Sequence, residues 1–388
     1  MAETCDLCSG QDLVLAYEPQ ASRRGLRVYV CAECGLVQSL PRHDRAPREA
    51  ANISAGADWG NLRYGKGFRV GAHMALLAGR AWSTGAPQIL DVGSNRGAFL
   101  TAALEAWPSA KITAVEPDER VTSAYETLPQ VVLMHNRIED CAFGEATLDL
   151  IYSSHTLEHV ASARRVLVQH AHTLRRDGLL LLEVPNIAVL DSKDLVEEWF
   201  IDKHLYHFSP TTLRALLAIA GLEIIEGPKP GDNEYLTVLA RPAPPQAASA
   251  VIDSCEHERA SRLIFAASIT RARNVNALRT AASAIMSEKG RVVVWGAGRL
   301  FDALVREGGL NPSRLAGLID EGLRKHVADR HGVTLCDSAA LADLDADLVV
   351  VASRSFAQEI ATKVRALSPH SRVLTFAELL DRAQKSAA

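Results

Sequence analysis

The sequence predicts an α/β protein in three parts: a small four-cysteine module, a central doubly wound sheet and a second Rossmann-like unit. Two Cys-x-x-Cys pairs stand within the first 34 residues. Further on, the runs 88–97 and 291–298 each pass from a short apolar stretch into a glycine-containing turn. A strand that leaves through glycines into a helix is the usual ligand-binding element of parallel α/β sheets, so two such elements predict two sheets.

Length and composition limit the possible classes of protein. The chain has 388 residues, 48% hydrophobic content and a formal net charge of −4, which suits an ordinary soluble protein of two or three domains. It has no long Lys/Arg run, which argues against a nucleic-acid partner, and no apolar run near the ~18 residues needed to span a membrane. The start, Met1 to Cys5, lacks the pattern of a signal peptide. We therefore expect a cytoplasmic protein whose cysteines are thiols or metal ligands.

The N-terminal cysteines predict a zinc ribbon within residues 1–45. The pairs are Cys5/Cys8 and Cys31/Cys34, and the 22 residues between them suffice for a small hairpin. Four thiolates complete the tetrahedral coordination of Zn²⁺, so the site is expected to be structural, with no open position for catalysis. The alternative, a redox-active dithiol, lacks the strand and helix that a thioredoxin-like motif needs.

The first glycine-containing turn predicts a nucleotide-type site. The apolar run 88–92 is typical of a buried strand, and the turn residues after it include Gly93, Ser94, Asn95 and Gly97. Glycine allows the backbone to approach a ligand closely and leaves the N–H groups at the helix start facing it. A second strand, 112–115, ends at Glu116 and Pro117, where a carboxylate can accept both hydroxyls of a ribose.

This pattern resembles the class I S-adenosylmethionine (SAM) methyltransferases. The run 90–97 reads Leu-Asp-Val-Gly-Ser-Asn-Arg-Gly, Val-Glu-Pro follows at 115–117, and segments 148–155 and 179–186 resemble the fourth and fifth strands of those enzymes. The resemblance implies a methyltransferase domain over residues 46–241. It also implies SAM contacts from Asp91, Gly93, Ser94, Asn95, Gly97, Glu116, Pro117, Ser153 and His155, with Tyr64 of the preceding connector as a further candidate. The alternative is a Rossmann-like sheet that has lost its cofactor.

A second motif overlaps this pattern. Residues 155–159, His-Thr-Leu-Glu-His, fit the His-x-x-Glu-His of inverted zinc proteases, in which two histidines hold a metal and the glutamate activates water. Here His155 directly follows a predicted strand, so His155 and His159 need not share a helical face. We therefore expect His155 near the methionine part of SAM, and Glu158 and His159 in the start of a helix.

Candidate catalytic residues precede a helix start. Residues 191–199 are expected to be helical, and Ser209 and Pro210 are a typical N-cap and first helical residue. Between these helices stand Lys203, His204, Tyr206 and His207. Histidine titrates near neutral pH and can act as a general base. We expect His204 to be the base and His207 to position it, with Lys203 balancing negative charge.

The three-part layout resembles bacterial sugar C-methyltransferases over nearly the whole chain. In those enzymes a base removes the proton beside the keto group of a nucleotide-linked sugar, and the enolate attacks the methyl of SAM. Their Tyr-x-Glu-His motif falls at residues 201–204, which here read Ile-Asp-Lys-His, so only the histidine is shared. With a hydroxyl acceptor, His204 would instead deprotonate that hydroxyl as it attacks the methyl carbon. Both carbon and oxygen methylation stay open.

The C-terminal part predicts a second Rossmann-like unit. Residues 242–290 combine a Pro/Ala linker with one long or two shorter bridging helices, and 291–388 form the unit. Its candidate contacts are Gly296, Gly298 and Asp320. In the resembled enzymes this unit binds substrate. NAD(P) is the alternative ligand, although Phe301 stands where a third glycine would be.

The functional expectation is a SAM-dependent methyltransferase with a structural zinc ion and a small-molecule acceptor, best matched by a sugar nucleotide. Neither nucleic acid nor a membrane is expected as a partner. A nicotinamide-dependent oxidoreductase or epimerase, and a non-catalytic SAM- or nucleotide-binding scaffold, are the alternatives. The acceptor, the methylated atom and the oligomeric state do not follow from the sequence.

Overall fold

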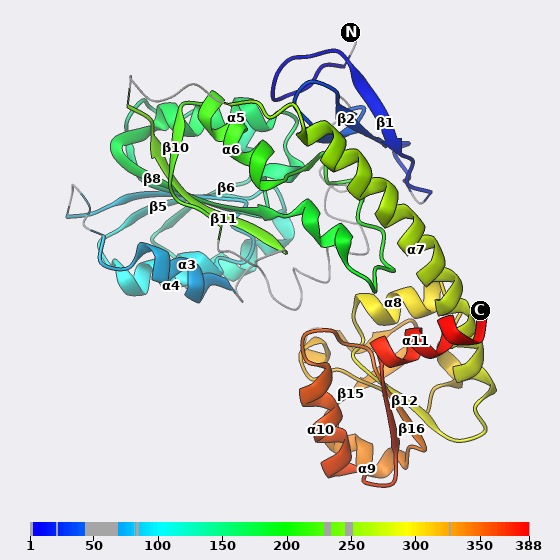
Figure 1. Ribbon diagram of the computed structural model, residues 1–388. Coiled ribbons are helices and arrows are strands. Elements are labelled where there is room, and N and C mark those ends of the chain that lie inside the picture. Colours follow the sequence, from blue (N-terminus) through cyan, green and yellow to red (C-terminus); the bar gives the residue numbers. More distant parts are fainter. Residues whose placement is uncertain are drawn as a thin grey trace. The chain divides into compact units, whose positions relative to one another are not determined.

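The computed structural model describes residues 3–20, 22–42, 69–80, 82, 85–228, 234–244, 251–325 and 327–387. It has two compact units, Met1–Leu190 with Phe200–Phe265, and Asp191–Trp199 with Ala266–Ala388 (Figure 1). The expected bridging segment 242–290 contains one 32-residue helix, α7 (Glu256–Ser287), which begins in the first unit and ends in the second. Its start belongs to the first unit because Glu256 accepts a hydrogen bond from Ser209, and the His257 ring bonds the Cys31 oxygen.

The cysteine module shares a sheet with the rest of the first unit. Its four antiparallel strands run in the order β1 (Leu13–Tyr17), β2 (Arg27–Cys31), β3 (Val37–Leu40) and β9 (Tyr206–His207). Val37 faces His207 and Gln38 faces Tyr206 across β3 and β9. The expected division near residue 45 is therefore not a structural boundary, because the second half of the unit supplies the strand that covers the β3 edge.

The central sheet has seven strands in the order β10-β11-β8-β7-β4-β5-β6. They are β4 (Gln88–Val92), β5 (Lys111–Val115), β6 (Val131–Met134), β7 (Leu148–Ser154), β8 (Leu174–Pro185), β10 (Leu222–Glu226) and β11 (Tyr235–Pro242). Strands β4 to β8 are parallel, and β11 is antiparallel to both β8 and β10. The strand order reverses between β4 and β7, the position where doubly wound sheets bind ligands. The four strands that the sequence predicts for this sheet are present.

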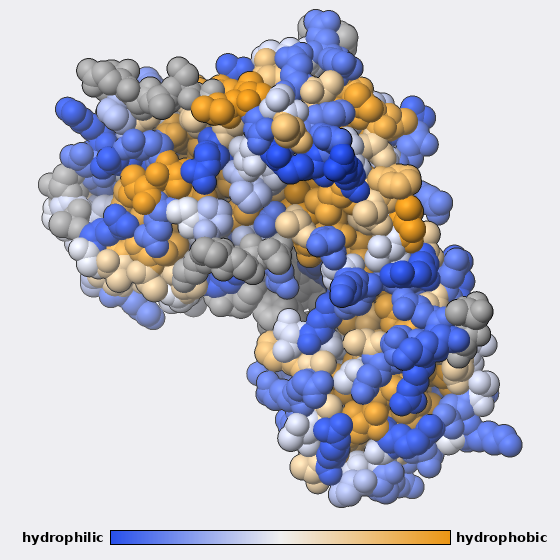
Figure 2. Space-filling model, in the orientation of Figure 1, coloured by the Kyte–Doolittle hydropathy of each residue, from blue (hydrophilic) through white to orange (hydrophobic). Residues whose placement is uncertain are grey.

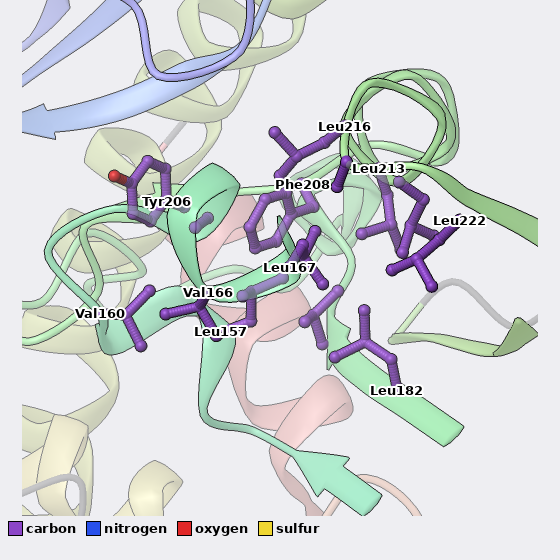
Figure 3. Packing of buried hydrophobic residues seen from close by; sticks show 14 of the residues in the cluster. Leu157, Val160, Val166, Leu167, Leu182, Tyr206, Phe208, Leu213, Leu216 and Leu222 are labelled. Atoms are coloured by element: carbon purple, nitrogen blue, oxygen red, sulfur yellow. The ribbon is translucent and has the colours of Figure 1, made fainter. Parts of the chain in front are cut away.

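Helices cover both faces of this sheet (Figure 1). They are α3 (Val70–Leu77) and α4 (Ala98–Ala106) on one face, and α5 (Ala163–Thr173) and α6 (Pro210–Ile219) on the other. Short 3₁₀ turns are η2 (Glu119–Thr127), η3 (Ile138–Asp140), η4 (Leu157–His159) and η5 (Ile187–Asp191). Successive β8 residues Leu181 and Leu182 enter two separate apolar clusters, because strand side chains alternate between faces. Figure 3 shows the cluster with Leu182, in which Leu167 and Leu213 of α5 and α6 pack.

The helix after the candidate catalytic segment begins where the sequence predicts. Ser209 is the N-cap of α6, Pro210 is the first helical residue, and Thr212 completes a capping box. The expected helix over 191–199 does not form, since η5 ends at Asp191. Those residues belong to the second unit, where Arg354 binds the carboxylates of Asp194 and Glu197 at 2.6 and 2.7 Å.

The second unit contains a six-stranded sheet in the order β14-β15-β13-β12-β16-β17, parallel except for β14. The strands are β12 (Val292–Trp295), β13 (Gly317–Ile319), β14 (Asp329–Arg330), β15 (Val333–Cys336), β16 (Leu348–Val351) and β17 (Arg372–Thr375). Its helices are α8 (Arg299–Arg306), α9 (Leu341–Leu344), α10 (Ala357–Leu367) and α11 (Phe376–Ala387), with 3₁₀ turns η6 (Pro312–Arg314), η7 (Leu323–Lys325) and η8 (Ser338–Ala340). Figure 2 shows hydrophilic residues over much of its viewed face.

Across the described ranges, no helix combines the length and apolar character required to cross a membrane.

A buried histidine on α5 makes the stability of the first unit sensitive to acid. His170 is 1% exposed, and its Nε2 has no hydrogen-bond partner among the described residues. Burial lowers the pKa of His170 to about 4, whereas an unfolded histidine titrates near about 6.5. Between these pH values the unfolded chain binds a proton that the folded chain does not, so stability falls as the pH drops through this window. The loss is on the order of 2 kcal/mol between about pH 6.5 and pH 5.

His170→Leu is expected to remove this contribution, which urea unfolding at pH 7 and pH 5 measures. His172→Leu, an exposed position on the same helix, is the matched control and should keep the wild-type pH dependence. An acid sensitivity unchanged by His170→Leu would contradict the assignment.

Candidate functional site

The turn after β4 adopts the backbone that its glycines allow. Gly93, Asn95 and Gly97 have φ values of +69°, +50° and +76°, in the left-handed region that favours glycine. The Gly93 N–H donates to the Val115 oxygen at 2.7 Å, which holds the turn against the end of β5. A Cβ on Gly97 would lie 2.9 Å from a methyl of Leu128, so this position is also restricted in space.

Glu116 binds the same turn. Its Oε2 accepts the Asn95 N–H and its Oε1 accepts the Asp118 N–H, both at 2.9 Å. The carboxylate thus lies where the sequence predicts, at the carboxyl end of β5 beside the glycine turn. Each carboxylate oxygen has a further acceptor position, so the ribose contact stays a prediction. Pro117, which follows, is half-buried.

A small pocket opens at this switch point. It is lined by Val70, Asp91, Gly93, Ser94, Ala98, Phe99 and Tyr152. Three predicted cofactor residues, Asp91, Gly93 and Ser94, therefore share one cavity with the aromatic pair Phe99 and Tyr152, whose rings stack at 3.7 Å. Of the other predicted contacts, Ser153 is buried next to this pocket in β7, and Tyr64 lies outside the described residues.

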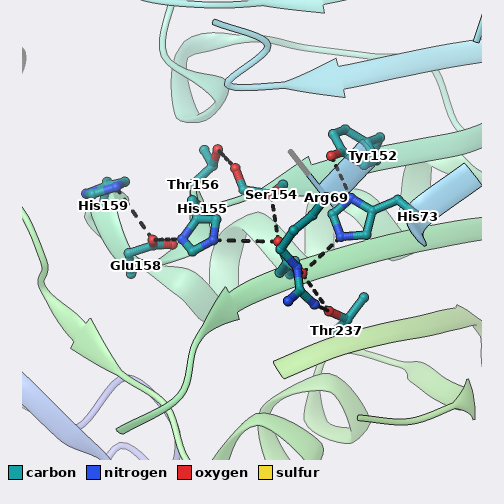
Figure 4. A network of polar contacts seen from close by, with 10 residues as sticks. Arg69, His73, Tyr152, Ser154, His155, Thr156, Glu158, His159 and Thr237 are labelled. Atoms are coloured by element: carbon teal, nitrogen blue, oxygen red, sulfur yellow. Dashed lines mark hydrogen bonds and ion pairs between the residues drawn. The ribbon is translucent and has the colours of Figure 1, made fainter. Parts of the chain in front are cut away.

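A buried polar network lies beside this pocket (Figure 4). Its centre is Glu183 of β8, 1% exposed, whose Oε2 contacts Arg69 Nε at 2.6 Å, His73 Nε2 at 2.9 Å and the Thr237 hydroxyl at 2.6 Å. Although burial favours the neutral acid, the neighbouring imidazoles of His155 and His73 hold the pKa of Glu183 well below its usual range. Sequence reasoning missed this residue; the available signal was one charge inside the apolar run 179–185.

His155 links two buried carboxylates. Its φ is +50°, and its Nδ1 lies 3.4 Å from Glu158 Oε1 while its Nε2 lies 3.6 Å from Glu183 Oε1. Burial alone would lower the pKa of His155, but the two carboxylates raise it above the ordinary value. The two carboxylates therefore favour the protonated imidazole, which suits His155 to balancing negative charge rather than to accepting a proton.

The glycine turn after β4 and residues 155–159 lie next to each other. The Thr156 hydroxyl donates to the Val92 oxygen at 3.0 Å, directly before Gly93. Next to this contact, the centroids of the His159 and His204 rings lie 4.9 Å apart. The Leu205 N–H donates to the backbone carbonyl oxygen of Glu158 at 2.7 Å. The structure thus brings the glycine turn, residues 155–159 and the predicted base onto one edge of the sheet.

His204 is half-buried, and its environment favours the neutral imidazole. Burial is the largest cause, followed by the positive charge of His159 and Lys203, and together they hold the pKa of His204 well below its ordinary value. A neutral imidazole has one nitrogen able to accept a proton.

Tyr206 and His207 lie in the core rather than in the site. Tyr206 is 1% exposed and its hydroxyl donates to the Ala161 oxygen at 2.9 Å. The His207 Nε2 bonds the Ser39 hydroxyl at 2.9 Å, and burial lowers the pKa of His207 to about 3. Both side chains face the packed interior because β9 is paired with β3. They help to position the segment that carries His204, and a catalytic role for Tyr206 or His207 stays a prediction.

The loop before β2 also fixes this segment. The Asp202 carboxylate accepts the Arg23 N–H at Oδ2, at 2.7 Å, and the Ser22 hydroxyl at Oδ1. The backbone oxygen of Asp202 accepts a hydrogen bond from the Arg24 guanidinium at 3.0 Å. The cysteine module thus holds residues 202–207 by strand pairing and by these contacts. The sequence offered no local signal for this, since the partners are about 180 residues apart.

The four N-terminal cysteines converge as predicted. All four Sγ atoms lie within 4.8 Å of one another, with Cys5 and Cys34 at 3.4 Å and Cys8 and Cys31 at 3.5 Å. Thiolates on one Zn²⁺, each at about 2.3 Å, stand roughly 3.7 Å apart in a tetrahedron. The donor set and spacing therefore fit a four-thiolate zinc site.

The second glycine turn repeats the arrangement of the first. The Gly296 N–H donates to the Ile319 oxygen at 2.8 Å, and Asp320 accepts the N–H groups of Ala297 and Leu323 at 3.1 and 2.9 Å. A Cβ on Gly296 would lie 2.5 Å from the Ala352 oxygen, and Gly298 is the N-cap of α8. Asp320 is 2% exposed, so its visible role is to hold the turn, and substrate contacts from these residues stay a prediction.

Comparison with known proteins agrees with the first site. Residues 63–226 match a family model described as a methyltransferase domain. The chain carries a SAM-dependent methyltransferase domain. A tRNA U34 carboxymethyltransferase of Syntrophotalea carbinolica is 32% identical over 172 residues, covering 41% of this chain and 50% of that protein. The chain thus spans about half the length of this curated relative.

Two solved structures resemble this chain at lower sequence identity. A putative SAM-dependent methyltransferase from Listeria monocytogenes has 18% identity and a TM-score of 0.34, covering 41% of this chain and 92% of its own. The 1,6-didemethyltoxoflavin-N1-methyltransferase of Burkholderia thailandensis has 19% identity and a TM-score of 0.38, covering 59% and 100%.

The methyltransferase match contains the glycine turn, residues 155–159 and the His204 segment. It does not extend to the cysteines at 5–34 or to residues 266–388, which make up most of the second unit. The His-x-x-Glu-His motif thus lies inside the methyltransferase domain. Its two histidines also have different further neighbours, because His155 contacts Glu183 while the His159 ring lies beside His204. Neither observation favours a zinc protease.

Proposed function

We propose that the protein transfers the methyl group of SAM to a small-molecule acceptor bound beside His204. The contact between Thr156 and Val92 carries this proposal, because it joins the cofactor turn to the segment that faces His204. SAM would lie along residues 91–97 with its ribose toward Glu116. His155, whose protonated form the neighbouring carboxylates favour, would face the negative end of the donor or the acceptor.

A nucleotide-linked sugar is the acceptor that we propose. The three-part layout resembling sugar C-methyltransferases supports it, and His204 supplies a neutral imidazole. On a keto sugar, His204 takes the proton beside the carbonyl and the enolate carbon attacks the methyl. On a hydroxyl, His204 takes the O–H proton and the oxygen attacks. In both reactions the carbon–sulfur bond of SAM breaks, S-adenosylhomocysteine leaves, and alignment of donor and acceptor supplies much of the rate.

Mass spectrometry of nucleotide-linked keto and hydroxy sugars, incubated with the protein and SAM in D₂O, tests this function. Methyl gain with loss of a carbon-bound hydrogen would establish carbon methylation. Methyl gain with every carbon-bound hydrogen retained would establish oxygen methylation. An unfractionated tRNA sample belongs in the panel, because the curated relative is named for tRNA. Methylation of tRNA with none of the sugars would overturn the proposed acceptor class.

His204→Ala is expected to lower kcat for methyl transfer at least ~100-fold, the low end of the contribution of a general base. The SAM dissociation constant should stay unchanged, since His204 is placed on the acceptor side. The matched control is His172→Ala, an exposed histidine of the same unit, which should retain full activity. Full activity in His204→Ala would remove this residue from the mechanism.

We also propose that Cys5, Cys8, Cys31 and Cys34 bind a structural zinc ion. The sulfur distances support it, together with the burial of Cys5, Cys31 and Cys34. Bound zinc would fix the β2–β3 turn and, through β3, the strand β9.

A further inference from the structure

We propose that Glu158, His159 and His204 bind a divalent first-row transition-metal ion. One carboxylate oxygen and one nitrogen from each ring lie within 4.8 Å of one another. Glu158 and His159 belong to η4 directly after β7, and His204 lies on the segment before β9. The cluster therefore combines two elements that the fold holds beside the cofactor turn, and it is separate from the four cysteines.

The strongest support for this site is the environment of the Glu158 carboxylate. Glu158 is 1% exposed, and neither oxygen has a hydrogen-bond partner among the described residues. Two ring nitrogens stand near it, His155 Nδ1 at 3.4 Å and His159 Nε2 at 3.7 Å from Oε1. A buried carboxylate needs charge-assisted hydrogen bonds or a metal to offset its loss of hydration. Here His155 offers an ion pair, but neither carboxylate oxygen accepts a hydrogen bond from a described residue, which leaves room for an ion.

The orientation of His159 agrees with a ligand role. Its Nδ1 lies 2.9 Å from the Lys203 oxygen. A carbonyl only accepts hydrogen bonds, so Nδ1 carries a proton, and Nε2 is the nitrogen whose lone pair can bind an ion. That lone pair faces Glu158 Oε1, which also presents lone pairs, at 3.7 Å. Metal-binding histidines characteristically donate their other N–H to a carbonyl or carboxylate in this way.

The donor set defines the class of ion. Two imidazoles and one carboxylate suit Zn²⁺, Fe²⁺ and their first-row neighbours, whereas Mg²⁺ and Ca²⁺ prefer oxygen ligands alone. Three protein ligands also leave coordination positions for another molecule. This differs from the four-cysteine site, which has no open position.

The ion would select the acceptor, an inference that rests on the proposed methyl transfer. A metal-bound hydroxyl loses its proton more readily than a free one. The acceptor would therefore bind through a hydroxyl, or through a hydroxyl and an adjacent carbonyl. Glu158, His159 and His204 would hold the ion; the acceptor hydroxyl would lose its proton to solvent, its oxygen would attack the methyl carbon, and S-adenosylhomocysteine would leave as the carbon–sulfur bond breaks. His204 then acts on the acceptor through the ion, which refines its role as a direct base.

Metal content of the full-length protein tests the site without any acceptor. The wild type and Glu158→Gln are saturated with Zn²⁺, desalted and measured by elemental analysis. Glu158→Gln keeps the size of the side chain and removes its charge. We expect the variant to hold one ion fewer per chain. Its affinity for Zn²⁺ at this site should fall about 100-fold or more, which exceeds the usual loss when a residue outside the ligand set is changed. His159→Ala should behave alike, and His172→Ala should keep the wild-type content.

Cobalt(II) substitution separates this site from the cysteines. Cobalt on thiolates has an intense sulfur-to-metal charge-transfer band, which should be equal in the wild type and Glu158→Gln. A weaker band from cobalt on nitrogen and oxygen ligands should be lost in the variant. Equal metal content and equal spectra in the wild type, Glu158→Gln and His159→Ala would overturn the proposal. If the metal difference appears but no acceptor in the panel is methylated, the site stands and the proposed function fails.

Discussion

Cys31→Ser is expected to remove most of the folding stability of the first unit. A structural zinc ion contributes on the order of 10 kcal/mol to the folding of a small module, about as much as the whole stability of a typical domain. Cys31 is fully buried at the end of β2, and its oxygen accepts a hydrogen bond from the His257 ring of α7. Losing the metal would therefore loosen the four-stranded sheet as well as the cysteine turns.

The effect should extend to the candidate site. Strand β9 has β3 as its partner, and the Ser39 N–H donates to the Leu205 oxygen at 2.9 Å, so the position of His204 depends on this module. Zinc content and urea unfolding measure the loss, and methyl transfer should fall with it. Cys255→Ser is the matched control, because Cys255 is exposed and lies outside the cluster. A Cys31→Ser protein that keeps its zinc and its unfolding midpoint would contradict the prediction.

The sequence predicted those parts of the fold that are determined by residues close together in the chain. Apolar runs and glycine positions predicted β4, β5, β7 and β8 of the central sheet and β12 of the second sheet, and Ser209 and Pro210 predicted the start of α6. These succeed because strand burial and helix capping are decided by neighbours in the sequence. The four cysteines converge because two Cys-x-x-Cys pairs leave few other arrangements for four thiolates.

What the sequence could not show are the long-range pairings. The pairing of β3 with β9 joins segments about 170 residues apart and moves Tyr206 and His207 into the core. The contacts of Asp202 with Arg23 and Arg24 are equally remote. The network around Glu183 was also missed, because its partners come from α3, β7 and β11 and none has a distinctive spacing in the sequence.

Gly93→Trp is expected to weaken SAM binding roughly 1,000-fold, equivalent to about 4 kcal/mol. Gly93 lines the pocket at the switch point, and its φ of +69° is one that a bulky side chain rarely adopts. An indole at this position would occupy space beside Asp91 and Ser94 that the cofactor needs. Calorimetric titration with SAM measures the change directly, without an acceptor.

The matched control is Gly221→Trp. Gly221 has a φ of +82°, nothing lies within 4 Å of a Cβ built there, and it stands between α6 and β10, away from the turn. It therefore carries a similar backbone strain without filling the pocket, and its SAM affinity should match the wild type. Equal losses in both variants would mean that strain, not occupancy of the pocket, weakens binding. Wild-type affinity in Gly93→Trp would instead place the cofactor away from this turn, even though the methyltransferase match includes it.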